Sequence, residues 1–124
     1  MRALSVKQPW AWAFFHAGKD VENRSRKTHH RGTLAIHASK SFDPAEYQAA
    51  AREIWRITGA YPPPSEDLPR GCVIGFVEVV DCIEQSTSPW AMRGYCHWQL
   101  RNPQTCPPFP VRGQQQIFLL SRFA

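Results

Sequence analysis

The chain has 124 residues, of which 43% are hydrophobic and 20% are charged. These totals exclude a disordered chain and are typical of one globular domain, which we expect to span residues 1–124. The net charge of +5 is unevenly spread, with +6 in residues 1–40, −5 in residues 41–84 and +4 in residues 85–124. If the fold brings both ends together, this pattern predicts a positively charged face that attracts phosphate groups, although mild basicity is common in small proteins.

The sequence predicts neither a membrane span nor a secretion signal. No apolar run reaches the roughly 18 residues of a membrane helix, and the start, MRALSVKQPW, lacks an apolar core and a cleavage site. We therefore expect a cytoplasmic location. The cysteines form no C-x-x-C pair, so we expect reduced thiols in or near the core, no metal site and no cofactor. They are Cys72, Cys82, Cys96 and Cys106.

The first elements predicted along the chain are a strand and a short helix. Residues 3–8, ALSVKQ, alternate apolar and polar, as in a strand. Pro9 suits the first turn of a helix, and Gly18 suits its left-handed cap. Apolar residues occur on every side of this helix, so we expect it to be wedged against a sheet.

Two strands separated by a basic loop are expected next. Residues 19–24, KDVENR, alternate imperfectly and predict a strand or strand edge. Residues 25–32, SRKTHHRG, are polar and predict a loop. Residues 33–39, TLAIHAS, predict a strand with Leu34 and Ile36 on one face.

A second helix is predicted to begin at Asp43 and to end at Gly59. Asp43 is a capping residue, Pro44 suits the first turn, and Glu46 completes a capping-box pattern. The expected buried face consists of Tyr47, Ala50, Ala51 and Ile54. A proline-rich loop then leads to the next strand.

The most apolar strand of the chain is expected over residues 72–82, where Gly75 indicates a bulge or bend. Further strands are expected at 95–100 and 117–122, joined by a long, partly extended loop over residues 101–116. Five or six strands and two helices in mixed order predict an α+β domain with a small, strongly bent sheet or barrel.

Four sequence blocks resemble the ASCH domain family. They are LSVKQPWAWAFFHAGKDVENRS, HRGTLAIHASK, GCVIGFVEVVDC and NPQTCPPFPVRGQQQIFLL. The resemblance covers nearly the whole chain and implies a PUA-like mixed β-barrel with helices over its ends. It also implies a cleft beside the first helix that binds RNA or single-stranded nucleic acid.

Some small members of this family are hydrolases that act on an acylated cytidine or cut RNA. Lys19 matches the lysine of the amidohydrolases, but Glu22 stands where they have threonine, and their catalytic glutamate has no aligned counterpart, Glu84 being only nearby. We therefore leave hydrolase activity as an alternative function, with Lys19, Glu22 and Glu78 as candidate catalytic residues. A third alternative is a protein-interaction domain with an apolar patch around Trp90 and Trp98.

The resemblance and the local chemistry together indicate a set of binding residues. In a regular strand, Lys19 would face away from Glu22 and Arg24, and Glu22 would hold Arg24 or Lys19 or accept from a base edge. The residues expected to contact nucleic acid are Lys7, Gln8, Trp10, Lys19, Glu22, Arg24, Arg26, Arg31 and His37.

Structural roles are open for several of these residues. Gln8 suits a cap or turn hydrogen bond as well as a base contact. Trp10 suits core burial as well as stacking. His37 suits a hydrogen-bonded, half-buried position. Glu78 lies in the apolar central strand, where Lys19 or Arg24 is a candidate partner for its carboxylate.

Overall fold

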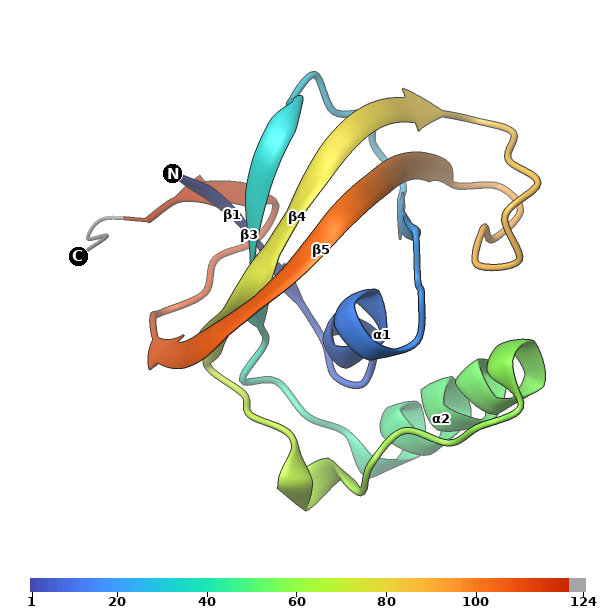
Figure 1. Ribbon diagram of the computed structural model, residues 1–124, viewed down its shortest axis with the longest axis vertical. Coiled ribbons are helices and arrows are strands. Elements are labelled where there is room, and N and C mark those ends of the chain that lie inside the picture. The colour runs from blue at the N-terminus through green and yellow to red at the C-terminus, as the bar shows by residue number, and fades with distance from the viewer. Residues whose placement is uncertain (121–124) are drawn as a thin grey trace.

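A computed structural model describes residues 1–120, which contain one curled six-stranded sheet and two helices (Figure 1). The strands are β1 (Arg2–Val6), β2 (Val21–Arg24), β3 (Gly32–Ala38), β4 (Cys72–Ile83), β5 (Cys96–Pro110) and β6 (Ile117–Leu119). The helices are α1 (Trp10–His16) and α2 (Pro44–Thr58), with a short 3-10 turn at Ser65–Asp67. The strand order is β2-β5-β4-β3-β1-β6; β1 and β3 pair in parallel, and the other neighbouring strands of this sheet pair antiparallel. This is the expected α+β architecture, a strongly curled half-barrel of the PUA-like type.

Helix α1 lies against the concave side of the sheet (Figure 1). Phe14 is only 1% exposed and packs with residues such as Leu34, Ile36 and Trp98 in the main core. Burying a side chain of this size contributes about 1.5–3 kcal/mol. Trp12 packs in a second cluster on another side of the helix. The expectation of a helix that is apolar all round and wedged against the sheet is therefore confirmed.

Gly75 marks a bend in β4, as the sequence predicts. The register of β4 shifts beside Gly75 against both neighbouring strands. A Cβ atom there would lie 2.5 Å from the Gln104 carbonyl oxygen and 2.7 Å from the Phe15 ring. Glycine therefore lets β5 and α1 approach the bend more closely than any side chain would allow.

The expected loop after residue 100 is wrong over residues 101–110, because β5 continues to Pro110. Within residues 1–120, strand β2 pairs with β5 only over residues 96–99, so no strand lies beside this edge of β5 beyond that point. Proline has no N–H to donate and is tolerated at such an edge or in a bulge. Pro107 and Pro108 lie in the register shift between Thr105 and Phe109, where the ladder is already interrupted.

Both helices end close to the predicted positions. Asp43 accepts a hydrogen bond from the Ala45 N–H at 2.9 Å, and Gly59 closes α2 with φ of 80°. Gly18 has φ of 71° just after α1. Pro9 precedes α1 as its capping residue and does not occupy the first turn, which begins at Trp10. The side chain of Glu46 forms an ion pair with Lys7 at 3.0 Å, where we expected the return bond of a capping box.

The remaining predictions concern the cysteines, the last strand and the membrane. All four cysteines are free thiols, and burial raises the pKa of Cys72 and Cys106.

Strand β6 covers Ile117–Leu119, and the last two positions of the predicted strand lie outside the described residues. Within residues 1–120, no helix is both long enough and apolar enough to cross a membrane.

Candidate functional site

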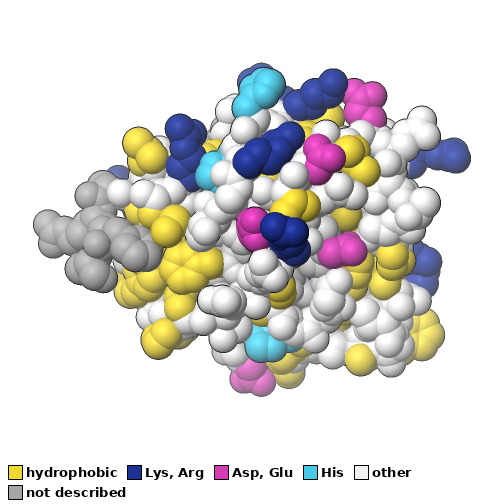
Figure 2. All heavy atoms as spheres, turned by 45° about the horizontal axis from the view of Figure 1, so that its top comes forward, with side chains coloured by type: hydrophobic (Ala, Val, Ile, Leu, Met, Phe, Trp, Pro, Cys, Tyr) yellow, Lys and Arg dark blue, Asp and Glu magenta, His cyan; other side chains and the backbone are white. Residues whose placement is uncertain are grey.

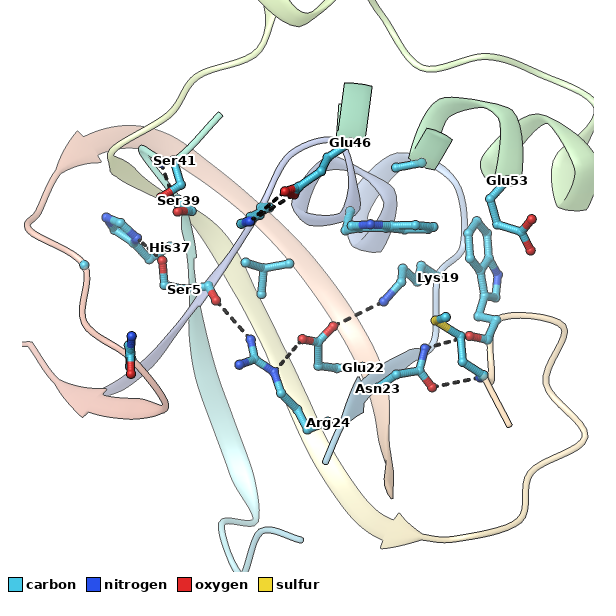
Figure 3. Close-up of a pocket in the computed structure, with 18 of the residues that line it drawn as sticks. Ser5, Lys19, Glu22, Asn23, Arg24, His37, Ser39, Ser41, Glu46 and Glu53 are labelled. Carbon is cyan, nitrogen blue, oxygen red and sulfur yellow. Dashed lines mark hydrogen bonds and ion pairs between the residues drawn. The ribbon is translucent and has the colours of Figure 1, made fainter. Parts of the chain in front are cut away.

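A large open cleft of about 1680 Å³ lies between the two helices, the open end of the sheet and two loops. Helix α2 forms one wall, and α1 contributes Trp10 to the floor. Strand β2 and residues 89–93 also line the cleft, and Trp90 packs against Ile54 of α2, while residues 110–116 line one end. Figure 3 shows Lys19, Glu22 and Arg24 near the middle, with Glu46 and Glu53 extending from α2 at the edge of the cleft.

Lys19 is buried beneath α1, with its side chain only 4% exposed. The Lys19 N–H donates to the Ala13 carbonyl at 3.1 Å, which turns the chain back under the helix. The ammonium group donates to the Val21 carbonyl at 2.6 Å and lies 4.4 Å from the centre of the Phe14 ring. Burial lowers the pKa of Lys19, and the adjacent Glu22 carboxylate partly opposes this shift.

Glu22 joins Lys19 to Arg24 through its two carboxylate oxygens. Oε1 lies 3.3 Å from Lys19 Nζ, and Oε2 accepts from Arg24 Nε at 2.8 Å. Arg24 Nη2 also donates to the Ser5 carbonyl at 3.0 Å. The Arg24 side chain is 30% exposed. It is therefore a fixed cation with one side open to the cleft, which suits recognition of a phosphate or base edge.

Positive charge outweighs negative charge in the lining of the cleft. Within residues 1–120, three acidic residues, Glu22, Glu46 and Glu53, line it, against seven basic ones. The basic residues are Lys7, Lys19, Arg24, Lys40, Arg56, Arg93 and Arg112. All except Arg56 come from the two basic segments of the sequence, so the fold does gather charge from both ends of the chain.

Most of the predicted binding residues lie together, and three lie elsewhere. Lys7, Trp10, Lys19, Glu22, Arg24 and His37 all line the cleft. Gln8 is buried, donates to the Pro69 carbonyl at 3.0 Å and accepts from the Trp12 N–H at 2.9 Å. Of the two roles that the sequence left open for Gln8, the structure therefore shows the hydrogen bond that holds the fold.

Arg26 and Arg31 do not line the cleft. Arg26 is exposed, and its carbonyl accepts from the Trp98 indole at 3.1 Å. Arg31 lies 3.6 Å from Asp81 on the surface. The basic loop is therefore paired in part with Asp81 of β4, and Figure 2 shows that Lys and Arg are interspersed with Asp and Glu on the face it draws.

Two expectations about charged partners are wrong. Lys19 does not face away from Glu22, because it precedes the first residue of β2 and its side chain folds over the strand. Glu78 pairs with neither Lys19 nor Arg24. Its carboxylate accepts from Arg101 at 3.0 Å and from Asn102 at 2.9 Å, and these hydrogen bonds lower its pKa.

His37 is buried at one end of the cleft. Its Nε2 atom lies 2.6 Å from the Val111 carbonyl, and its Nδ1 atom lies 2.9 Å from the Ser5 hydroxyl. Since a carbonyl only accepts, Nε2 carries the proton and the Ser5 hydroxyl donates to Nδ1. Gly113 packs against the ring, where a Cβ would lie 2.5 Å from Cε1. His37 therefore holds the wall formed by residues 111–113.

Trp90 and Trp98 do not form the exposed apolar patch that one alternative function requires. They are 6% and 5% exposed, respectively, and each packs in a core cluster. Glu84 is an exposed residue 3.3 Å from Lys27. Within residues 1–120, no group of three or more His, Cys, Asp or Glu is placed to hold a metal ion.

Asn23 and residues 89–93 line the cleft, but the sequence did not predict them as nucleic-acid-binding residues. Asn23 lies on β2 between the two predicted residues Glu22 and Arg24, and alternation alone would place it on the opposite face. The segment 89–93 has no periodic pattern. The only sequence signal was the long gap between the strands predicted at 72–82 and 95–100.

Comparison with known proteins identifies the family. The ASCH domain model matches residues 4–107. The chain belongs to the ASCH domain family. It is 35% identical over 135 aligned positions to Activating signal cointegrator 1 of Homo sapiens and 37% identical over 129 positions to that of Mus musculus. Each alignment covers 94% of this chain and 22% of the relative, so this ASCH chain spans about a fifth of each relative's length.

Proposed function

We propose that this ASCH domain binds nucleic acid, holding single-stranded RNA, single-stranded DNA or a nucleotide in the cleft beside α1. The observation that carries the proposal is Arg24, a cation fixed by Glu22 and Ser5 with one side open to a cleft in which basic residues outnumber acidic ones by seven to three among the described residues. A pre-oriented guanidinium binds phosphate or a base edge with little loss of side-chain entropy.

Trp10 supplies the second feature expected of such a cleft. It is half-buried and lines the cleft floor, within 5.6 Å of the Lys19 ammonium group. Stacking of a base on an aromatic side chain contributes about 1–3 kcal/mol and tolerates any base. A cationic cleft with an aromatic floor favours an unpaired strand, whose bases are free to stack.

The role proposed for Glu22 is to position the two cations. Both of its oxygens are occupied by Lys19 and Arg24, so it is less suited to accept from a base.

The family is generally associated with RNA binding, which agrees with the proposal that the cleft binds nucleic acid. The single-domain organisation of the whole chain and its cytoplasmic location remain predictions.

Binding of fluorescein-labelled single-stranded RNA and DNA oligonucleotides, measured by anisotropy between about 50 and 200 mM salt, tests the proposal. We expect affinity to fall with salt, and Arg24→Ala to weaken binding about tenfold or more. Arg101→Ala, on the outer face of the sheet, is the matched control and should bind as the wild type does. Absence of wild-type binding at low salt to either oligonucleotide would refute the proposal.

One observation favours the alternative of a hydrolase. Lys19 is a buried amine with a lowered pKa beside a carboxylate, an arrangement that enzymes use for general acid–base chemistry. Against this, its ammonium group already donates to a backbone carbonyl and to Glu22. A screen of acylated cytidines and labelled RNA decides the matter, and turnover that survives Lys19→Met would exclude this role for Lys19.

A further inference from the structure

The connection between β4 and β5 is unusually long for a hairpin. Residues 84–95 separate the two strands, whereas hairpin loops commonly contain about 2–5 residues. Long irregular loops in compact domains are often functional. This loop turns back toward the end of α2 (Figure 1), and residues 89–93 all line the cleft. It is therefore part of the cleft wall.

Asn23 of β2 holds this loop through its side-chain amide. Nδ2 donates to the Trp90 carbonyl at 3.0 Å, and Oδ1 accepts from the Met92 N–H at 3.0 Å. Oδ1 also lies 2.9 Å from Nδ1 of His97 on β5. Because an amide oxygen only accepts, His97 carries a proton on Nδ1 and donates it to Asn23. Both ends of the Asn23 amide are thus hydrogen-bonded to the loop, and His97 fixes the orientation of this amide.

A second set of contacts fixes the start of the same loop. The Ser88 hydroxyl donates to Asp20 Oδ1 at 2.6 Å and accepts from the Trp90 N–H at 3.2 Å. The Trp90 side chain is 6% exposed and packs with Ala13 and Ile54 beneath the cleft. The backbone of residues 88–92 is therefore anchored to β2, to α1 and to α2.

The loop presents its unanchored side chains to the cleft. Met92 is 53% exposed, and Arg93 is exposed as well. Both line the cleft, and Arg93 forms no ion pair with any residue in the described part of the chain. A lone arginine on a well-anchored loop beside a basic cleft is placed to meet an anionic ligand.

We propose that residues 88–93 form a recognition loop for the nucleic-acid strand, in which Arg93 contacts a phosphate and Asn23 is the positioning residue. This inference rests on the proposed function and extends the site beyond the Lys19–Glu22–Arg24 group. Asn23 carries no charge and acts on the ligand only through the loop that it holds.

The salt dependence of binding separates this role from a general structural one. A cation that contacts a phosphate adds close to one unit to the slope of log affinity against log salt. We expect Arg93→Ala to lower the slope by about one and to weaken binding about tenfold in moderate salt. Asn23→Ala should also lower the slope by about one, although it removes no charge. The double variant, Asn23→Ala with Arg93→Ala, should have the same affinity as whichever of the two single variants binds more weakly.

The experiment uses the same labelled single-stranded oligonucleotides and the full chain. Arg52→Ala is the matched control, because Arg52 is an exposed arginine of α2 that does not line the cleft, and it should leave the slope unchanged. Asn23→Asp preserves the side-chain size but sets a carboxylate oxygen against the Trp90 carbonyl and adds a negative charge to the cleft, so it should bind more weakly than Asn23→Ala. Thermal melting of each variant establishes that it is folded.

The outcomes distinguish this inference from the function on which it rests. Wild-type binding with an unchanged slope in Arg93→Ala would overturn the recognition loop and leave the cleft proposal intact. An unchanged slope in Asn23→Ala, with a lowered slope in Arg93→Ala, would overturn the positioning role. Absence of wild-type binding would overturn both proposals together.

Discussion

The cleft and the outer face of the sheet each contain a carboxylate that binds two donors, and burial distinguishes them. Glu22 in the cleft has a side chain 10% exposed and joins Lys19 to Arg24. Glu78 on the outer face is 32% exposed and binds Arg101 and Asn102, and the Arg101 side chain is 64% exposed. The local chemistry is similar, but water screens the charge of Glu78 strongly and that of the buried Glu22 only weakly.

This difference determines what each group can do. An exposed ion pair contributes little and exchanges readily with water. A buried carboxylate between two cations fixes their positions, because removing it leaves buried charge without a partner. The cleft therefore has cations at defined positions, while the outer face has charges that mainly keep the surface hydrated.

The largest effect is expected from removing the buried carboxylate. Glu22→Gln leaves Lys19 and Arg24 without their anionic partner, and we expect a loss of about 2–3 kcal/mol in the free energy of unfolding. Glu78→Gln is the matched change on the outer face and should leave stability unchanged within error. Urea unfolding of the two variants measures the contrast. Equal stabilities would mean that burial does not distinguish the two carboxylates.

A smaller effect is expected where His37 holds the cleft wall. Gly113→Ala places a Cβ against the imidazole ring, and we expect a loss of about 1–2 kcal/mol in unfolding free energy. In a His37→Ala background the ring is absent and the closest remaining neighbour is Ser5 Oγ at 3.1 Å, so the same change at Gly113 should cost much less. Denaturant unfolding of the four proteins of this cycle gives the coupling. Additive losses of unfolding free energy would show that the added methyl group at residue 113 does not clash with the His37 ring.

The smallest effect concerns the pH dependence of stability from Lys19. Burial lowers its pKa in the folded chain below its ordinary value of 10.5, so between the two pKa values the unfolded chain binds more protons. The contribution of Lys19 to stability therefore rises with pH across that window. The wild type should gain stability relative to Lys19→Met as pH approaches 10.5 from below.

The comparison with Lys19→Met cancels other alkaline titrations. Cys72 and Cys106 have raised pKa values and act in the opposite direction in both proteins. Urea midpoints of the two proteins, measured in parallel from neutral pH upward, give the difference. A difference that stays constant with pH would show that Lys19 keeps its ordinary pKa in the fold.

The sequence by itself determined most of the elements, and six of its nine candidate binding residues line the cleft in the described part of the chain. Asp43 and Gly59 set the ends of α2, because capping and left-handed backbone are local properties. The bend at Gly75 and the apolar faces of β3 and β4 followed from side-chain size and period. Local patterns also placed the charged run of Lys19, Glu22 and Arg24 after α1.

Only the tertiary structure decided which residues meet across the cleft. The continuation of β5 through its prolines depends on which edge of the strand is unpaired, and that is a property of the assembled sheet. Glu78 found Arg101 because the two residues are register partners on β4 and β5. Asn23 reached residues 90 and 92 because a long loop returns to β2. Such contacts join segments about 70 residues apart, and no periodic pattern in a single chain encodes them.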